Sequence, residues 1–187
     1  MNIIVFGPPG AGKGTQSKYL VKKINGFQIS TGDLLRDEIN KDSEIGKMII
    51  NDMNDGKFVS DEIVNKIITK FIFDPLKKNK LIFDGYPRSL SQAKNLESLL
   101  NDTNQKIDFV FFLNVNKDTI IKRIEKRKIL EKRLDDDLKT IIARFDTYMK
   151  TTKPVLDFYS KNPNFHEIDG TLEINEITRK IDSFINV

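Results

Sequence analysis

The feature that most constrains this chain is a glycine-rich stretch near its start, residues 7–15, which reads GPPGAGKGT. An apolar run with the character of a buried strand, Ile3–Phe6, precedes it, and an amphipathic run with helical spacing, Lys13–Ile24, follows it. A strand, a glycine-rich loop and a helix in this order form a phosphate-binding loop. Glycines let several backbone N–H groups point at one oxyanion, and the helix directs the positive end of its dipole to the same place.

The loop departs from the general pattern G-x-x-x-x-G-K-[ST] in one position. The pattern is met through Lys13, a mobile cation for the outer phosphates, but Gly14 comes next and the hydroxyl follows at Thr15. The alternative is a strand-to-helix turn with no ligand. The glycines, the lysine and the hydroxyl all fall in the right context, which favours a phosphate site.

Composition limits the class of protein. The 187 residues suit one domain, and 31% charged with 39% hydrophobic residues are ordinary for a soluble globular protein. No apolar stretch approaches the ~18 residues of a membrane span, and a strand that begins beside Met1 leaves no room for a signal peptide. We therefore expect a cytoplasmic protein with no membrane partner. No exposed apolar stripe is evident, so we expect a monomer.

Cysteine and charge exclude further classes. The chain has no cysteine, which rules out disulfides, thiolate metal sites and thiol catalysis. The net charge of +4 is modest, and the basic residues are spread along the chain among 27 acidic ones. A nucleic-acid binder concentrates its charge on one face or tail, so we expect no nucleic-acid partner.

Short β-rich runs alternate with longer helical patterns, which predicts a parallel sheet with helices on both faces. The expected strands are Asn2–Phe6, Phe27–Ile29, Leu81–Asp84, Phe109–Leu113 and Phe165–Ile168. The expected helices are Lys13–Ile24, Leu34–Asn40, Glu44–Asn54, Asp61–Phe73, Ser91–Leu100, Lys117–Arg127, Asp136–Tyr159 and Glu173–Ile185.

Local signals refine this order. Ser60 is placed to cap the helix that follows it, and Pro154 should kink or split the long helix around it. The crossover from Ile29 to Leu81 takes about fifty residues, far more than the roughly 10–12 that a plain βαβ crossover needs. We therefore expect a small helical insert that stands off the sheet and acts as a movable clamp.

Candidate chemistry follows the third strand. Asp84 ends that strand, where an acid in a phosphate-loop protein commonly faces Mg²⁺ through water. The alternative role for Asp84 is a capping residue at the turn. The turn that follows contains Gly85, Tyr86, Pro87 and Arg88, and it places the Arg88 guanidinium at the carboxyl end of a central strand, where ligands bind in open α/β sheets.

Four more arginines gather in the second half of a chain that otherwise uses lysine on its surface: Arg123, Arg127, Arg133 and Arg144. Arg123 and Arg127 are four apart and share one helix face. The alternative is a solvated basic face, but arginines are what phosphoryl transfer needs to stabilise charge on the equatorial oxygens, each worth ~10³–10⁵ in rate. His166, the only histidine, falls in the last expected strand, and we expect a structural or surface role for it.

Taken together, five motifs resemble the nucleoside monophosphate kinases and, within them, the adenylate kinase family. They are residues 7–16, Ser30–Asp33, Leu34–Arg36, Asp84–Arg88 and Arg133–Asp136. The resemblance extends over essentially the whole chain, with matching order and spacing. It implies the reaction MgATP + AMP ⇌ 2 ADP on a five-stranded P-loop core, with an AMP-binding insert at residues 30–59 and a lid that closes over ATP.

The resemblance also implies a role for each matching residue. Those at the ATP phosphates and adenine would be Gly10, Ala11, Gly12, Lys13, Gly14, Thr15, Arg123, Arg127 and, through its backbone, Leu172. Those at AMP would be Thr31, Arg36, Lys57, Phe58, Val59, Gly85, Tyr86, Pro87, Arg88, Gln92, Arg133 and Arg144. The catalytic set would be Lys13, Arg88, Arg123, Arg127, Arg133 and Arg144, and Mg²⁺ would lie near Thr15 and Asp84, through water.

Two details sharpen the resemblance. Only Lys128–Lys132 separates Arg127 from Arg133, which is similar to the short type of the family, with a loop at residues 127–137 as its lid and no zinc. That segment lacks the usual glycine. Thr31 together with Gln92 points to adenine, because an amide pairs with both a donor and an acceptor on the base edge, whereas kinases of UMP or CMP usually differ at both positions.

Three other classes of protein share part of this sequence pattern. We expect direct in-line transfer by positioning and charge stabilisation, because the chain offers no obvious nucleophile. A UMP/CMP kinase would share the fold and the mechanism. A GTP-binding switch would need N-K-x-D and D-x-x-G, but Asn116–Thr119 ends in Thr and no D-x-x-G occurs. A subunit that binds nucleotide without turnover is disfavoured by the retained Lys13, Asp84 and arginines.

Overall fold

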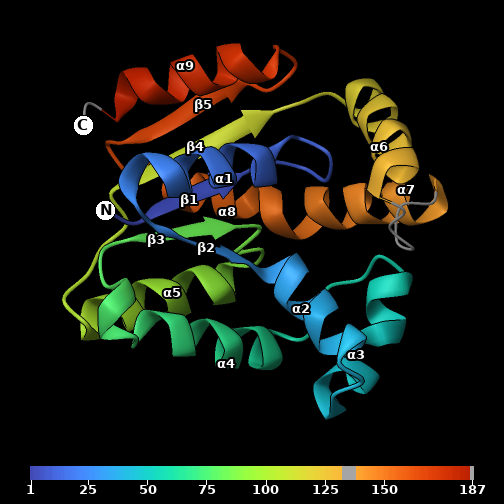
Figure 1. Ribbon diagram of the computed structural model, residues 1–187, viewed down its shortest axis with the longest axis horizontal. Helices are drawn as coiled ribbons and strands as arrows, with labels where there is room; N and C mark the ends of the chain where they lie inside the picture. The colour runs from blue at the N-terminus through green and yellow to red at the C-terminus, as the bar shows by residue number, and fades with distance from the viewer. Residues whose placement is uncertain (132–137, 186–187) are drawn as a thin grey trace.

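A computed structural model of the chain describes residues 1–131 and 138–185. Its centre is one sheet of five parallel strands in the order β2-β3-β1-β4-β5 (Figure 1). The strands are β1 Ile3–Phe6, β2 Phe27–Ser30, β3 Leu81–Asp84, β4 Phe109–Asn114 and β5 Phe165–Asp169. The predicted parallel α/β sheet is therefore confirmed, with each strand within a residue or so of its expected place.

Helices follow the strands along the chain. They are α1 Lys13–Ile24, α2 Thr31–Asn40, α3 Glu44–Asn54, α4 Asp61–Ile72, α5 Leu90–Asp102, α6 Lys117–Glu131, α7 Leu138–Thr147, α8 Lys153–Tyr159 and α9 Ile174–Phe184. A short 3₁₀ turn, Pro75–Lys77, precedes β3, and a π-helical turn, Tyr148–Thr152, joins α7 to α8.

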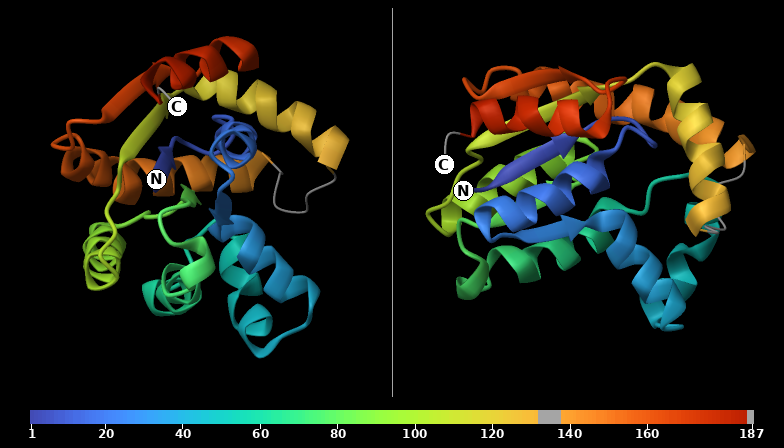
Figure 2. Two further views of the ribbon diagram at one scale, coloured as in Figure 1. Left: turned by 60° about the vertical axis from the view of Figure 1, so that its left-hand side comes forward. Right: turned by 45° about the horizontal axis from the view of Figure 1, so that its top comes forward.

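The sheet is covered on both faces (Figure 2). Successive side chains of a strand point to opposite faces, so Ile4 and Phe6 of β1 pack in one core with α4, α5 and α8. Ile3 and Val5 pack in a second core with α1, α6 and α9. All four are buried. This explains why β1 is continuously apolar, and it confirms the predicted helices on both faces.

Helices α2 and α3 project from the body beyond β2 (Figures 1 and 2). Their mutual packing is close, because a Cβ added to Gly46 of α3 would lie 2.2 Å from the Glu38 carbonyl oxygen of α2. Helix α2 begins at Thr31, three residues before the predicted Leu34. Ser30 is the cause, since its hydroxyl accepts the Asp33 N–H at 3.4 Å and caps the helix.

Other predicted helix ends are corrected. Ser60 precedes α4, but its side chain makes no capping hydrogen bond. The long helix predicted at 136–159 is split before Pro154, as expected, by the π-helical turn. Proline lacks the N–H that would continue the helical hydrogen bonds.

Helix α6 continues to Glu131 instead of ending at Arg127, because the run after Arg127 contains strong helix formers and no glycine or proline. The remainder of the predicted lid, 132–137, lies outside the described residues.

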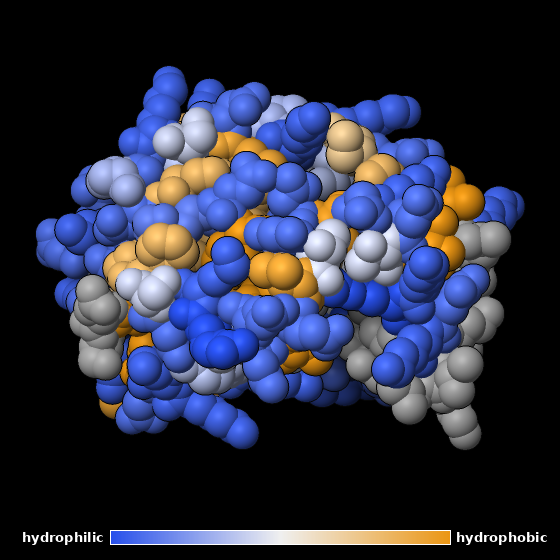
Figure 3. Space-filling view, turned by 90° about the horizontal axis from the view of Figure 1, so that it is seen from above, coloured by the Kyte–Doolittle hydropathy of each residue, from blue (hydrophilic) through white to orange (hydrophobic). Residues whose placement is uncertain are grey.

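Hydrophilic side chains dominate the face in Figure 3, with smaller apolar areas between them. Within residues 1–131 and 138–185, no helix combines the length and the apolar character that crossing a membrane requires.

Candidate active site

The loop between β1 and α1 has the geometry of an anion cradle. Gly10 and Gly12 take φ values of 79° and 94°, which favour glycine. A Cβ on Gly10 would lie 2.9 Å from the Ile124 side chain, so α6 packs directly on the loop. In the described structure no side chain caps α1 at Gly12, and its first turn holds no acidic residue. The first N–H groups of α1 are thus oriented for an anionic ligand.

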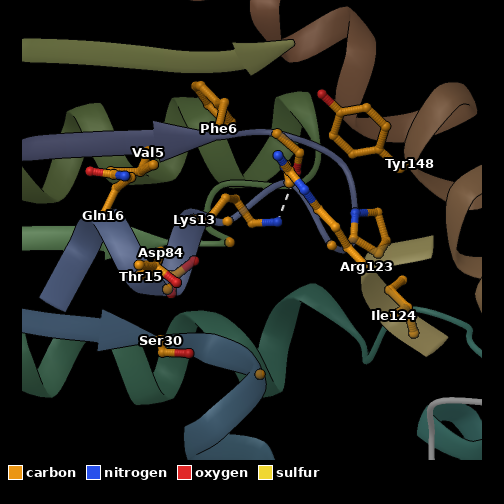
Figure 4. Close-up of a pocket in the computed structure, with 18 of the residues that line it drawn as sticks. Val5, Phe6, Lys13, Thr15, Gln16, Ser30, Asp84, Arg123, Ile124 and Tyr148 are labelled. Atoms are coloured by element: carbon orange, nitrogen blue, oxygen red, sulfur yellow. Dashed lines mark hydrogen bonds between the residues drawn. The ribbon is translucent and has the colours of Figure 1, made fainter. Parts of the chain in front are cut away.

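Lys13 lies in the centre of this cradle (Figure 4). Its Nζ donates to the carbonyl oxygens of Gly7 at 2.9 Å and Pro8 at 3.0 Å. These are neutral acceptors, and a phosphate oxygen is a stronger partner for an ammonium group. The Lys13 ammonium group therefore lies at the site, where it can exchange these carbonyl acceptors for the oxygens of a bound phosphate.

An open cleft of about 660 Å³ lies in front of the loop. It brings together most of the site residues predicted from the sequence: Gly10, Ala11, Gly12, Lys13, Gly14, Thr15, Arg36, Phe58, Asp84, Gly85, Pro87, Arg88, Arg123, Arg144 and Leu172. Of the predicted residues whose side chains are described, Thr31, Lys57, Val59, Tyr86 and Gln92 do not line it. The Arg127 side chain and Arg133 lie outside the described residues.

Asp84 ends β3 at the bottom of the cleft and is buried. Burial raises the pKa of its carboxyl, while the Lys13 charge and a 2.9 Å hydrogen bond from Gln28 Nε2 act in the opposite direction. Its Oδ2 is 3.4 Å from the Cβ position of Gly14, so the carboxylate lies against the start of α1, which carries Thr15. A carboxylate and a hydroxyl are hard oxygen donors of the kind that Mg²⁺ prefers, so these residues fit that ion.

Arg88 faces the cleft from the turn after β3. Its Nε donates to the Gly85 carbonyl at 2.6 Å, and its guanidinium lies 5.0 Å from the ring centre of Phe58. Desolvation lowers the pKa of Arg88 to about 10, with the neighbouring charge of Arg144 acting in the same direction. The guanidinium stays charged at neutral pH, and a bound anion would relieve its repulsion with Arg144.

The other described arginines approach from three further elements. Arg36 of α2 pairs with Asp33 at 2.5 Å. Arg123 of α6 donates to the Leu172 carbonyl at 3.4 Å. Arg144 of α7 has its Cγ 3.1 Å from the Cβ position of Gly56. Elements far apart in the sequence thus direct guanidinium groups into one cleft.

A second layer supports the Arg88 turn. Thr31 Oγ1 donates to the Gly85 carbonyl at 2.9 Å. Gln92 is buried, accepting the Arg88 N–H at 2.7 Å through Oε1 and donating through Nε2 to Asp61 at 2.7 Å. Tyr86 is fully buried and donates to Asn65 Oδ1 at 2.9 Å. In this state the Gln92 amide holds the turn that carries Arg88.

The segment that follows α3 has mixed exposure. Lys57 is exposed and pairs with Asp55 at 2.9 Å. Phe58 lines the cleft, and Val59 is buried in the first core. His166 lies in β5 with its ring stacked on Phe184, the ring centres 3.8 Å apart, which agrees with the structural role expected for it.

Sequence reasoning missed several polar residues at the site. Gln28 orients Asp84, Asp61 holds Gln92, and the Thr152 hydroxyl donates to the Arg88 carbonyl at 3.1 Å. Tyr148 lines the cleft, and its buried hydroxyl has no hydrogen-bond partner among the described residues (Figure 4). The one signal for Gln28 was a polar residue within the short β2 run. The others lie in helices where single polar residues are common.

Comparison with known proteins identifies the family of the chain. A family model described as adenylate kinase matches residues 5–164. The adenylate kinase of Pelagibacter ubique is 49% identical, with both chains covered in full. That of Mycoplasma capricolum is 42% identical over 90% of this chain and 91% of the relative, and that of a Nocardioides species is 35% identical over 100% and 98%. The extent of these matches shows that the chain belongs to the adenylate kinase family.

Proposed function

We propose that this protein catalyses the reversible transfer of a phosphoryl group from MgATP to AMP, giving two ADP and balancing the adenine nucleotides of the cell. The observation that carries the proposal is a single cleft lined both by a phosphate loop and by arginines from four separate elements. Phosphoryl transfer requires little more than this, because its catalysis is almost entirely positioning and charge stabilisation.

ATP occupies the half of the cleft at the β1–α1 loop. The backbone of Gly10–Thr15 surrounds its phosphates, and Lys13 leaves the carbonyls of Gly7 and Pro8 to bind the outer ones. Arg123 lies beside Leu172, so one short region serves both the phosphates and the adenine. Arg127 adds a second guanidinium from α6.

AMP occupies the half between the α2–α3 insert and the Arg88 turn. Arg36 and Arg88 hold its phosphate, with the Phe58 ring stacked on the Arg88 guanidinium. Thr31, the backbone of Lys57–Val59 and the turn Gly85–Pro87 form the walls, and Gln92 selects adenine. Gln92 keeps one amide hydrogen and one oxygen lone pair beyond the bonds it makes to Asp61 and Arg88, which is the donor–acceptor pair that adenine requires.

Transfer is in line and direct, with no covalent enzyme intermediate. Arg88, Arg133 and Arg144 stabilise the charge of the moving phosphoryl group from the AMP side, and Lys13, Arg123 and Arg127 from the ATP side. Thr15 and Asp84 hold the magnesium ion of MgATP through water, and that ion supplies further neutralisation of phosphate charge. The insert at 30–59 and the short lid at 127–137 close only over both substrates, which excludes water and so suppresses ATP hydrolysis.

The test is phosphoryl transfer from MgATP to AMP, CMP, UMP and GMP under one set of conditions. Fast transfer to AMP alone is the expected result. A preference for CMP or UMP would keep the fold and the mechanism but contradict the assignment of Thr31 and Gln92. Nucleotide binding without transfer to any acceptor would contradict the enzymatic proposal itself.

A further inference from the structure

Two threonines tie one helical segment to both walls of the cleft. The segment is α7 with the π-helical turn that follows it, Leu138–Thr152, and it carries Arg144. Near its start, Thr140 Oγ1 donates to the carbonyl oxygen of Asn54 at 3.1 Å. At its end, Thr152 Oγ1 donates to the carbonyl oxygen of Arg88 at 3.1 Å. One bond reaches the insert, and the other reaches the turn after β3.

Both hydroxyls belong to buried residues. Thr140 is 6% exposed and Thr152 is 4% exposed. Asn54 is the last residue of α3, where carbonyl groups lose their partners within the helix, so the Thr140 hydroxyl satisfies one of these from outside. A buried hydroxyl that lost its acceptor would carry a desolvation cost, which makes these bonds matter more than bonds of exposed hydroxyls.

The contact around Thr140 is close enough to fix the distance between the end of the insert and α7. Gly56, two residues beyond α3, has φ 71°, and a Cβ there would lie 3.0 Å from the Thr140 carbonyl oxygen and 3.1 Å from Arg144 Cγ. Thr140 and Arg144 are four apart and share one face of α7. The bare glycine thus lets the end of the insert lie directly on the stem of Arg144.

We propose that Thr140 and Thr152 are positioning residues for the AMP half of the reaction, a pair that we name the threonine clamp. The clamp holds Arg144 at a fixed place between Asn54 of the insert and Arg88 of the turn. Phe58, two residues past Gly56, then meets the Arg88 guanidinium at 5.0 Å. This inference rests on the proposed assignment of the AMP site. Neither threonine needs to contact a substrate.

The chain contains matched controls on the same helical segment. Thr147 Oγ1 donates to the Ala143 carbonyl at 2.7 Å, and Thr151 Oγ1 donates to the Thr147 carbonyl at 2.7 Å. Both bonds stay within the segment. Replacing each threonine in turn by valine removes the hydroxyl and keeps the shape. The comparison therefore separates hydroxyls that join elements from hydroxyls that do not.

We expect Thr140→Val and Thr152→Val each to lower kcat/KM for AMP by about 3- to 10-fold, the effect of one lost hydrogen bond, with KM for ATP within about twofold of the parent. Thr147→Val and Thr151→Val should match the parent. Thr140→Ser and Thr152→Ser should also match it, since serine keeps the donor. The proposal is overturned if the valine pair matches its controls, if KM for ATP rises as much as KM for AMP, or if serine fails to restore activity.

A second measurement does not depend on activity. Amide hydrogen exchange across residues 54–58, without nucleotide, should be faster in Thr140→Val than in Thr147→Val, and equal exchange in the two would contradict the clamp. Should Thr140→Val fail to fold, Thr140→Ala serves in both measurements. A parent enzyme that transfers nothing to AMP would contradict the proposed function while this exchange comparison still tests the clamp.

Discussion

At the scale of single residues, the cleft is a concentration of positive charge that the fold holds together before any anion binds. Desolvation and Arg144 both lower the pKa of Arg88, so burial and the neighbouring charge disfavour the charged guanidinium. A phosphate between the arginines converts that cost into attraction. Arg88 was predictable from the contiguous motif at Asp84–Arg88, and Arg144 from the use of arginine in a chain that otherwise uses lysine on its surface.

Replacing Arg88 by alanine should lower kcat by about 10³-fold or more, because arginines at a transferring phosphoryl group are worth that much. Arg88→Lys should recover only part of the loss, since lysine lacks the planar fork. The matched control is Arg179→Ala, which removes an exposed arginine of α9 outside the cleft. Steady-state kinetics with a thermal unfolding curve tests this, and normal turnover of a folded Arg88→Ala variant would remove Arg88 from the mechanism.

Asp84→Asn should raise the Mg²⁺ concentration needed for half-maximal activity by about 10- to 100-fold, because the variant keeps the size of the side chain and loses its charge. Mg²⁺ titration at fixed ATP measures this. Gln28 can still donate to the asparagine oxygen, so the local structure should survive. An unchanged Mg²⁺ midpoint would show that Asp84 has no part in holding the ion.

At the scale of elements, the proposed AMP site depends on helices that stand off the sheet. The three central strands were predictable because β1, β3 and β4 are short apolar runs, and the edge strands β2 and β5 because an aromatic residue and an isoleucine recur in each. The helix ends were less so, since Ser30 adds a turn to α2 and α6 runs past Arg127. The bonds of Gln28, Asp61, Thr140 and Thr152 could not be predicted, because each joins residues distant in the sequence and depends on how the elements pack.

Gly46→Ala should loosen the insert, because its Cβ would lie 2.2 Å from the Glu38 carbonyl oxygen and 2.8 Å from Ile39 Cα. Helices α2 and α3 must separate to accept it. Overpacking costs about one or two kcal/mol, and a free-energy change of this size corresponds to a several-fold rise in KM for AMP. We expect KM for ATP to stay unchanged. Lys47→Ala, an exposed neighbour in α3, is the control. A rise in KM for ATP of the same size would contradict this division of the cleft.

At the scale of the whole molecule, two apolar cores lie on opposite faces of the sheet. They fix the positions of the β1–α1 loop, the turn after β3 and α7 relative to one another. Helices α1 and α9 lie over the same face and are joined at their surface, where the Tyr19 hydroxyl donates to Asp182. That hydrogen bond, followed by desolvation and the Asp182 charge, raises the pKa of Tyr19 to about 12. Lys23 also pairs with Asp182, at 3.6 Å.

This contact gives the free energy of unfolding a pH dependence. Tyrosine in an unfolded chain titrates near pH ~10, so the stabilisation is complete below that pH and is lost as the pH rises through about 12. The stability difference between the parent and Tyr19→Phe should be constant up to pH ~10 and shrink above it. Urea unfolding across that range measures it, and a difference that stays constant to pH ~12 would contradict the role of the hydroxyl.

The stoichiometry of the reaction distinguishes phosphoryl transfer to AMP from hydrolysis of ATP. Purified protein is mixed with MgATP and isotopically labelled AMP, and all nucleotides and inorganic phosphate are quantified over time. If the protein transfers a phosphoryl group from ATP to AMP, ATP and labelled AMP disappear at equal rates, two ADP form per ATP, one of them labelled, and no phosphate is released. Phosphate release as ATP is lost, or label that stays in AMP and does not reach ADP, would contradict this transfer.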